Sequence, residues 1–165
     1  MSAPLIYFAY GSNLSFARLY ARCPSIENLG IGRLVDHTLH FTKPGGDGSG
    51  KCGIEKRPGD EVLGVLYQMA YEEKPILDRI EGLGHDYQVE DVIIETDRGE
   101  VDCFTYYPTR NDAAMPPWDW YKAFVYQGAR ENGFPEAYLR RIEAVEHLID
   151  PDAVRRAMNF ASLHG

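Results

Sequence analysis

A short turn near the N-terminus has the composition of an anion-binding site. The apolar run 5–10 predicts a strand, and the run 15–22 predicts a helix. Gly11, Ser12 and Asn13 stand between them. Gly11 has access to positive φ and lets a ligand approach the backbone closely, and Ser12 and Asn13 are helix-capping types. Because the first N–H groups of a helix are unsatisfied and lie at its positive end, we expect this turn to hold a carboxylate or phosphate. A capped helix start without a ligand is the alternative.

Glu81 is the acidic residue whose placement asks for a functional explanation. Residues 73–81 predict a short helix, with Pro75 in its first turn and Gly82 just past its end. Leu77 and Glu81 are four residues apart and therefore share the apolar face. A carboxylate there meets the negative end of the helix dipole and partial burial, and both raise its pKa. Such a group suits general acid–base catalysis. The alternative is an exposed Glu at a frayed helix end.

The elements that must position these residues are mostly strands in the first part of the sequence and helices in the last part. Further strands are predicted over 34–42, 61–69, 87–96 and 100–107, and helices over 118–132, 135–148 and 151–163. The turn Asp97-Arg98-Gly99 makes the last two strands a hairpin. This order indicates an α+β fold, with a mostly antiparallel mixed sheet or small β-barrel flanked by helices. A chain of 165 residues is predicted to be a single domain.

The composition excludes several classes of partner. Seventeen Lys and Arg against 25 Asp and Glu give a formal net charge of −8, which argues against binding nucleic acid or an anionic membrane. No apolar run approaches the roughly 20 residues of a membrane span, and the N-terminus lacks the basic region of a signal peptide. Cys23, Cys52 and Cys103 are odd in number and widely spaced, so we expect free thiols and a cytoplasmic protein. A monomer and a homodimer both stay open.

The glycine-rich segment 44–53, predicted as a loop, resembles a phosphate-binding motif only in part. Residues 45–51 match G-x-x-x-x-G-K, but Cys52 follows where a Ser or Thr would hold Mg²⁺. Gly53 and Pro58 also forbid the helix that this motif requires. We therefore interpret the segment as a flexible surface loop or a lid over the site. The histidines and cysteines show no metal-ligand spacing, so neither a metal nor a cofactor is expected.

Three patches of sequence resemble the γ-glutamylcyclotransferase family. The first is Tyr10-Gly11-Ser12-Asn13-Leu14, directly after the first strand. The second is Asp78-Arg79-Ile80-Glu81-Gly82, with Tyr87 shortly after it. The third is Tyr121 ahead of the segment 128–133. The resemblance runs from about Tyr7 to the region of Ile149 and implies a barrel flanked by helices.

The resemblance implies an enzyme that converts a γ-glutamyl amino acid or peptide to 5-oxoproline and releases the free amine. Glu81 falls at the position of the catalytic Glu, where it would act as general acid and base. The turn from Tyr10 to Leu14 would bind a carboxylate or the oxyanion, and Tyr87 and Tyr121 would line the pocket. A core Tyr is the alternative for Tyr121, because it shares a helical stripe with Phe124. A γ-glutamylamine or carrier-linked substrate, or a non-catalytic binding module, also stays open.

Overall fold

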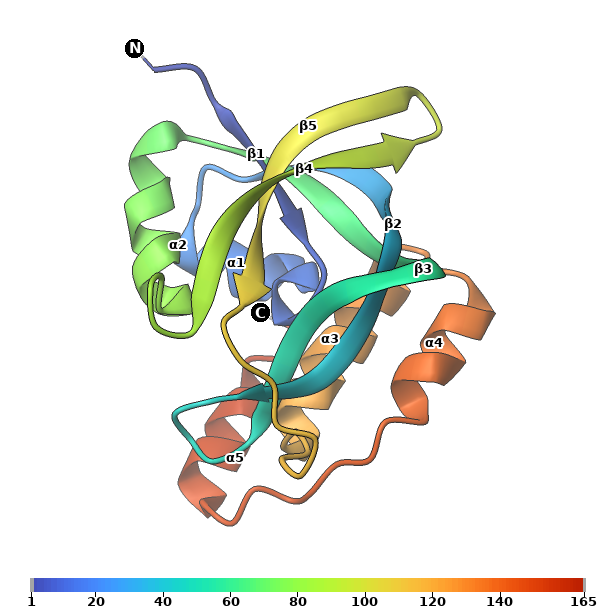
Figure 1. Ribbon diagram of the computed structural model, residues 1–165. Coiled ribbons are helices and arrows are strands. Elements are labelled where there is room, and N and C mark those ends of the chain that lie inside the picture. The colour runs from blue at the N-terminus through green and yellow to red at the C-terminus, as the bar shows by residue number, and fades with distance from the viewer. Residues whose placement is uncertain (1, 165) are drawn as a thin grey trace.

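Five strands close into a barrel in the order β1-β3-β2-β4-β5 (Figure 1). The structure is a computed structural model that describes residues 2–164. The strands are β1 (Leu5–Ala9), β2 (Glu27–Pro44), β3 (Gly50–Met69), β4 (Tyr87–Thr96) and β5 (Gly99–Pro108). Neighbouring strands are antiparallel except β1 and β5, which pair in parallel with Tyr7 opposite Phe104. The expected α+β fold with a mostly antiparallel mixed barrel is confirmed.

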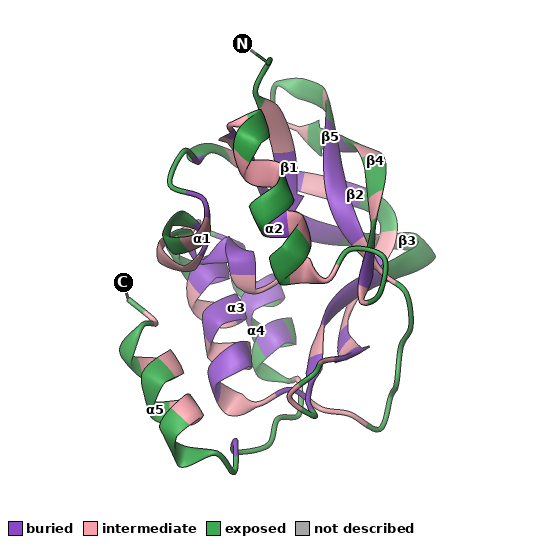
Figure 2. Cartoon of the chain, turned by 90° about the vertical axis from the view of Figure 1, so that its left-hand side faces the viewer, coloured by how far each residue is buried: buried purple, intermediate pink, exposed green. Residues whose placement is uncertain are grey.

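Five helices flank the barrel. They are α1 (Phe16–Arg22), α2 (Lys74–Glu81), α3 (Asp119–Glu131), α4 (Glu136–Glu143) and α5 (Ala153–Ala161), and short 3₁₀ turns precede α1 (η1, Ser12–Leu14) and α2 (η2, Tyr71–Glu73). Helix α2 lies beside the barrel, whereas α3, α4 and α5 lie around the long β2–β3 hairpin (Figure 1). Figure 2 shows α3 largely buried and α5 largely exposed. None of the helices described within residues 2–164 has the length and apolarity of a membrane span.

The β2–β3 hairpin is much longer than the sequence pattern predicts. The sequence predicts strands over 34–42 and 61–69 with a loop over 44–53, but the two strands pair from Glu27 opposite Gln68 to Pro44 opposite Gly50. Three shifts of register interrupt this pairing. Only residues 45–49 form the connecting loop. A Cβ at Gly50 would lie 2.0 Å from the carbonyl oxygen of Phe41, so the strand needs glycine there. Gly50, which by its type predicts a loop, is thus required by close packing within a strand.

Helices α4 and α5 are shorter than the predicted segments 135–148 and 151–163. Helix α4 ends at Glu143, the chain then turns at Ala144, and Leu148 forms a parallel bridge with Trp118. The N-cap Asp152 begins α5 by accepting a hydrogen bond from the N–H of Arg155. Local helix propensity after Glu143 is therefore overridden by pairing with a distant segment.

Helix α3 packs directly against the turn that follows β1. Its predicted inward stripe, which includes Tyr121 and Phe124, is buried. A Cβ at Gly128 would lie 2.5 Å from the backbone of Leu14, so the helix touches the turn there. The carbonyl of Leu14 also accepts hydrogen bonds from the side chains of Tyr67 (3.2 Å) and Asn132 (3.1 Å). These contacts fix the turn between the barrel and α3.

Candidate functional site

The turn after β1 leaves three consecutive backbone donors free. The N–H of Leu14 donates to the carbonyl of Gly11 at 3.0 Å, and Ser15 caps α1 by accepting from the N–H of Arg18. Within residues 2–164, the N–H groups of Gly11, Ser12 and Asn13 have no hydrogen-bond acceptor. Free N–H groups at such a turn are suited to binding an anion.

Gly11 does not adopt the positive φ that its type allows, because its φ is −113°. The glycine is needed for close approach instead. A Cβ at this position would lie 2.9 Å from the Cβ of Cys52 and 3.4 Å from the hydroxyl oxygen of Tyr121. The turn at Gly11 therefore packs closely against Cys52 and Tyr121.

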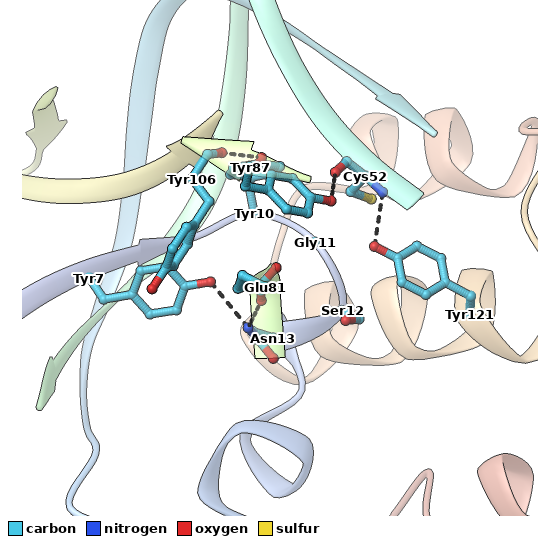
Figure 3. Close-up of a pocket in the computed structure, with 10 residues that line it drawn as sticks. All are labelled: Tyr7, Tyr10, Gly11, Ser12, Asn13, Cys52, Glu81, Tyr87, Tyr106 and Tyr121. Carbon is cyan, nitrogen blue, oxygen red and sulfur yellow. Dashed lines mark hydrogen bonds between the residues drawn. The ribbon is translucent and has the colours of Figure 1, made fainter. Parts of the chain in front are cut away.

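An inner pocket with an empty volume of about 300 Å³ lies between the turn, the barrel and α2 (Figure 3). It is lined by Tyr7, Tyr10, Gly11, Ser12, Asn13, Cys52, Glu81, Tyr87, Tyr106 and Tyr121. Seven of the eight residues proposed from the sequence are thus brought together. The exception is Leu14, whose side chain is buried beneath the turn and whose N–H is used within it.

Three lining residues were missed by the sequence reasoning: Tyr7, Cys52 and Tyr106. The alternation of a strand places Tyr7 on the same face as Ala9, and Tyr106 on the same face as Phe104. That signal was available, but nothing local to Cys52 marks it, because it belongs to a segment predicted as a loop. Burial raises the pKa of the Cys52 thiol to about 12, so the thiol is protonated at neutral pH and is a poor nucleophile.

Glu81 extends into the pocket from the last turn of α2. Its Oε1 accepts a hydrogen bond from the side-chain Nδ2 of Asn13 at 3.0 Å (Figure 3). Burial raises the pKa of Glu81, and the nearby charge of Arg22 and the hydrogen bond from Asn13 oppose that shift only in part. The direction agrees with the expectation from its place on the helix. A carboxyl with a raised pKa both accepts and returns a proton readily near neutral pH.

The side chain of Asn13 orients Glu81. Its Oδ1 accepts from a guanidinium N–H of Arg22 at 2.9 Å, and its Nδ2 also lies 3.2 Å from the hydroxyl of Tyr7. Because Arg22 only donates, it fixes which end of the amide faces Glu81. The turn thus supplies backbone donors and also holds the carboxyl group in place.

The two predicted pocket tyrosines are fastened to the backbone of Cys52. The hydroxyl of Tyr121 accepts from the Cys52 N–H at 2.9 Å, and the hydroxyl of Tyr87 donates to the Cys52 carbonyl at 2.6 Å. Burial raises the pKa of both phenols well above the usual value, so both stay neutral. A side-chain hydrogen bond with the Cys52 thiol also raises the pKa of Tyr121.

An outer pocket, which is open to solvent and has an empty volume of about 550 Å³, adjoins the inner one. It is lined by Ser12, Arg18, Arg22, Lys43, Gly45, Gly46, Lys51, Ile80, Glu81, Asp86, Tyr87 and Tyr121. Four residues line both pockets, namely Ser12, Glu81, Tyr87 and Tyr121. Glu81 therefore lies at the junction. The glycine-rich loop forms part of the outer wall, and the four cations of this pocket were not anticipated from the sequence.

The part of the chain that the structure describes contains no group of three or more His, Cys, Asp or Glu side chains arranged to hold a metal ion. The inner pocket itself brings together a buried carboxyl, three free backbone donors and a neutral phenol. These are the components of acid–base catalysis with oxyanion stabilisation.

Comparisons with known proteins match most of the chain. The model of the AIG2-like family matches residues 61–142. A curated protein named gamma-glutamylcyclotransferase from Bos taurus is 37% identical over 148 residues, which cover 86% of this chain and 78% of that protein. Its namesake from Homo sapiens is 38% identical over 148 residues with the same coverage. A solved structure named gamma-glutamyl cyclotransferase superposes with a TM-score of 0.89 at 32% identity, covering 99% of this chain and 100% of that one.

Proposed function

The chain belongs to the γ-glutamylcyclotransferase family, and we propose that it converts a γ-glutamyl amino acid or peptide to 5-oxoproline with release of the free amine. The chain is thus an enzyme, and Glu81 is its general acid and base. The observation that carries the proposal is the position of Glu81, which lines the inner and outer pockets at their junction. A substrate that spans both pockets has its scissile bond beside this carboxyl group.

The reaction is an intramolecular transfer of an acyl group. The α-amine of the γ-glutamyl group attacks its own γ-carbonyl carbon, so that a carbon–nitrogen bond closes a five-membered ring. The original amide bond then breaks, and its nitrogen leaves as a free amine. Counted from the α-ammonium group, the attacking nitrogen loses two protons, one before the attack and one as the ring nitrogen becomes an amide. The leaving nitrogen gains two and departs as an ammonium group, so no outside oxidant or co-substrate is needed. The protein must hold the folded substrate, move the proton and stabilise the oxyanion.

The inner pocket suits the γ-glutamyl half. The free N–H groups of Gly11, Ser12 and Asn13 are donors for its α-carboxylate or for the oxyanion on the γ-carbon. The hydroxyl of Tyr121 lines the same pocket and is proposed as a further contact for this half of the substrate. How these donors divide between carboxylate and oxyanion is part of the proposal.

Glu81 carries the proton between the two nitrogens. In its charged form it accepts a proton from the α-ammonium group, which makes that nitrogen a nucleophile. It returns this proton to the leaving nitrogen on the side of the outer pocket, and the second proton, which the ring nitrogen gives up as the ring closes, follows the same route. Because the pKa of Glu81 is raised towards neutral pH, Glu81 can both accept the proton and return it at neutral pH.

The test is to incubate the purified protein with a panel of γ-glutamyl amino acids, peptides and amines, and to measure 5-oxoproline and free amine by mass spectrometry. We expect the two products in equal amounts. The matched control is the α-linked isomer of each dipeptide, which lacks a γ-amide and should yield no 5-oxoproline. A protein that binds 5-oxoproline but forms none from any compound would be a binding module, and the proposed activity would be wrong.

A further inference from the structure

Arg18 is a cation of the outer pocket without a carboxylate partner. Its Nε donates to the hydroxyl of Ser12 at 3.2 Å, and its guanidinium carbon lies 4.5 Å from the ring centroid of Phe124. Among the described residues 2–164, no Asp or Glu lies within ion-pair distance of Arg18 or of Arg22, which is one helical turn further along α1. The chain has a formal net charge of −8 and therefore more carboxylates than cations, yet neither arginine pairs with one.

Lys51 approaches the same region from β3. Its Nζ lies 4.7 Å from the ring centroid of Trp120 and 4.6 Å from that of Tyr121, and it pairs with Asp47 at 2.8 Å. The guanidinium carbon of Arg18 is 5.9 Å from the Trp120 centroid. Both cations therefore lie beside one aromatic wall. Tyr121 belongs to that wall and to both pockets.

Two like charges held close together in a half-buried pocket oppose folding unless something compensates them. Burial lowers the pKa of Lys51, the charge of Arg18 lowers it further, and Asp47 only partly offsets both. Burial likewise lowers the pKa of Arg18 to about 10, with a second contribution from Arg22. An anion bound beside both side chains would relieve this repulsion. A carboxylate fits, because guanidinium and ammonium groups form their stronger hydrogen bonds with it.

We infer that Arg18 and Lys51 recognise a carboxylate group on the leaving half of the substrate and thereby select amino acids or peptides over simple amines as the released product. The inference rests on the proposed function, because it assigns the outer pocket to the leaving group. The γ-glutamyl half has its own donors in the turn, so this carboxylate is a second one. Lys51 is the lysine of the partial phosphate-binding motif in residues 45–51. In this proposal it binds a carboxylate in place of a nucleotide phosphate.

The test compares two substrates that differ only in that group: γ-glutamyl-alanine and γ-glutamyl-alaninamide, which ends in a neutral carboxamide. For the wild type we expect kcat/KM to favour the carboxylate by roughly tenfold or more, the range of a hydrogen bond to a charged group. Arg18→Met and Lys51→Met should each bring this ratio towards one, and Arg18→Lys should keep part of it. Lys56→Met is the matched control, because it removes one positive charge from an exposed site and should keep the ratio.

The outcomes separate the two proposals. If neither compound nor any other γ-glutamyl compound yields 5-oxoproline, the proposed function fails. If both compounds yield it at equal kcat/KM in the wild type, the proposed function stands and the inference about Arg18 and Lys51 is wrong. A preference that survives both Met substitutions also overturns it. Equal losses on both substrates would place these residues with the γ-glutamyl half instead.

Discussion

The side-chain Nδ2 of Asn13 lies 3.0 Å from Oε1 of Glu81, and this contact joins the turn after β1 to the end of α2. The two residues are 68 positions apart in the chain. Arg22 holds the other end of the same amide, so the orientation of Glu81 depends on the first helix as well. We therefore expect Asn13 to influence the proposed reaction through Glu81.

Asn13→Ala removes this positioning contact. Because the hydrogen bond from Asn13 lowers the pKa of Glu81, its loss raises that pKa. The acidic limb of the pH profile of kcat/KM, which reports the free enzyme, should move to higher pH. We expect kcat/KM at neutral pH to fall on the order of 10²-fold, as for a misplaced catalytic group. An unmoved acidic limb with wild-type activity would show that Asn13 does not position Glu81.

Tyr121→Phe tests whether this phenol serves the site beyond its role in packing. The substitution leaves the N–H of Cys52 without its acceptor, which costs about 1–3 kcal/mol of stability. Tyr138→Phe is the matched control, since its hydroxyl accepts from the N–H of Leu63 at 3.2 Å outside both substrate pockets. Thermal unfolding should show similar losses for both variants, whereas kcat should fall for Tyr121→Phe alone. Equal kcat values would remove Tyr121 from the site.

Gly128→Ala should destabilise the protein, although the same change in an exposed helix interior stabilises by about 1 kcal/mol. The added Cβ would lie 2.5 Å from backbone atoms of Leu14 and Ser15, which cannot move aside as a side chain can. Overpacking of this kind costs about 1–3 kcal/mol. It also displaces the turn that carries the backbone donors, so activity should fall more than stability. A more stable and fully active variant, judged by urea unfolding and 5-oxoproline release, would contradict the packing described for α3.

Asp150 anchors the C-terminal region, and its contribution to stability should depend on pH. Its carboxylate accepts from Trp120 Nε1 at 2.8 Å and from two guanidinium nitrogens of Arg155 at 2.6 Å. Arg155 holds the pKa of Asp150 below its usual range. A lowered pKa contributes stability above the unfolded value, about 3.9, and that contribution is lost as the pH falls below it.

Asp150→Asn should therefore unfold at lower denaturant concentration than the wild type at pH 7. The difference between the two proteins should shrink between about pH 4 and pH 2, because the unfolded wild-type chain takes up a proton at Asp150 in this range while the folded carboxylate resists protonation. Urea unfolding at several pH values measures it. A difference that stays constant over this range would show that the ion pair with Arg155 does not stabilise the fold.

The local parts of the fold could be predicted from the sequence. The strand from Tyr87 to Thr96 and the turn to the next strand follow from alternation and a Gly-containing turn, and the structure has both. The length of the β2–β3 hairpin could not be predicted, because glycines and charged residues near Gly53 and Pro58 favour a loop by type. Pairing with a strand across the hairpin outweighs that preference.

The site could be predicted in part for a similar reason. The position of Glu81 on the apolar face of a short helix predicts it as a site residue. The position of the turn between a strand and a helix predicts the anion-binding turn. The contact of Asn13 with Glu81 and the approach of Lys51 to Arg18 arise only when the barrel closes. No local pattern encodes such contacts between distant segments, so the outer pocket was not foreseen.

The central claim is that Glu81 transfers the proton in cyclisation, and Glu81→Gln tests it most directly. Glutamine keeps the size of the side chain but cannot accept the proton of the α-ammonium group. The fold should survive, and stability at neutral pH should rise, because a buried carboxyl with a raised pKa opposes folding when it is charged. Glu72→Gln is the matched control, since it removes an exposed carboxylate just before α2.

The measurement is the rate of 5-oxoproline release from a γ-glutamyl dipeptide by the wild type and the two variants. We predict that the turnover of Glu81→Gln falls by at least roughly 10²–10⁴-fold, the contribution of one general acid–base step, because Glu81 serves two such steps. Glu72→Gln should keep the wild-type rate. A folded Glu81→Gln variant that releases 5-oxoproline at the wild-type rate would contradict the account.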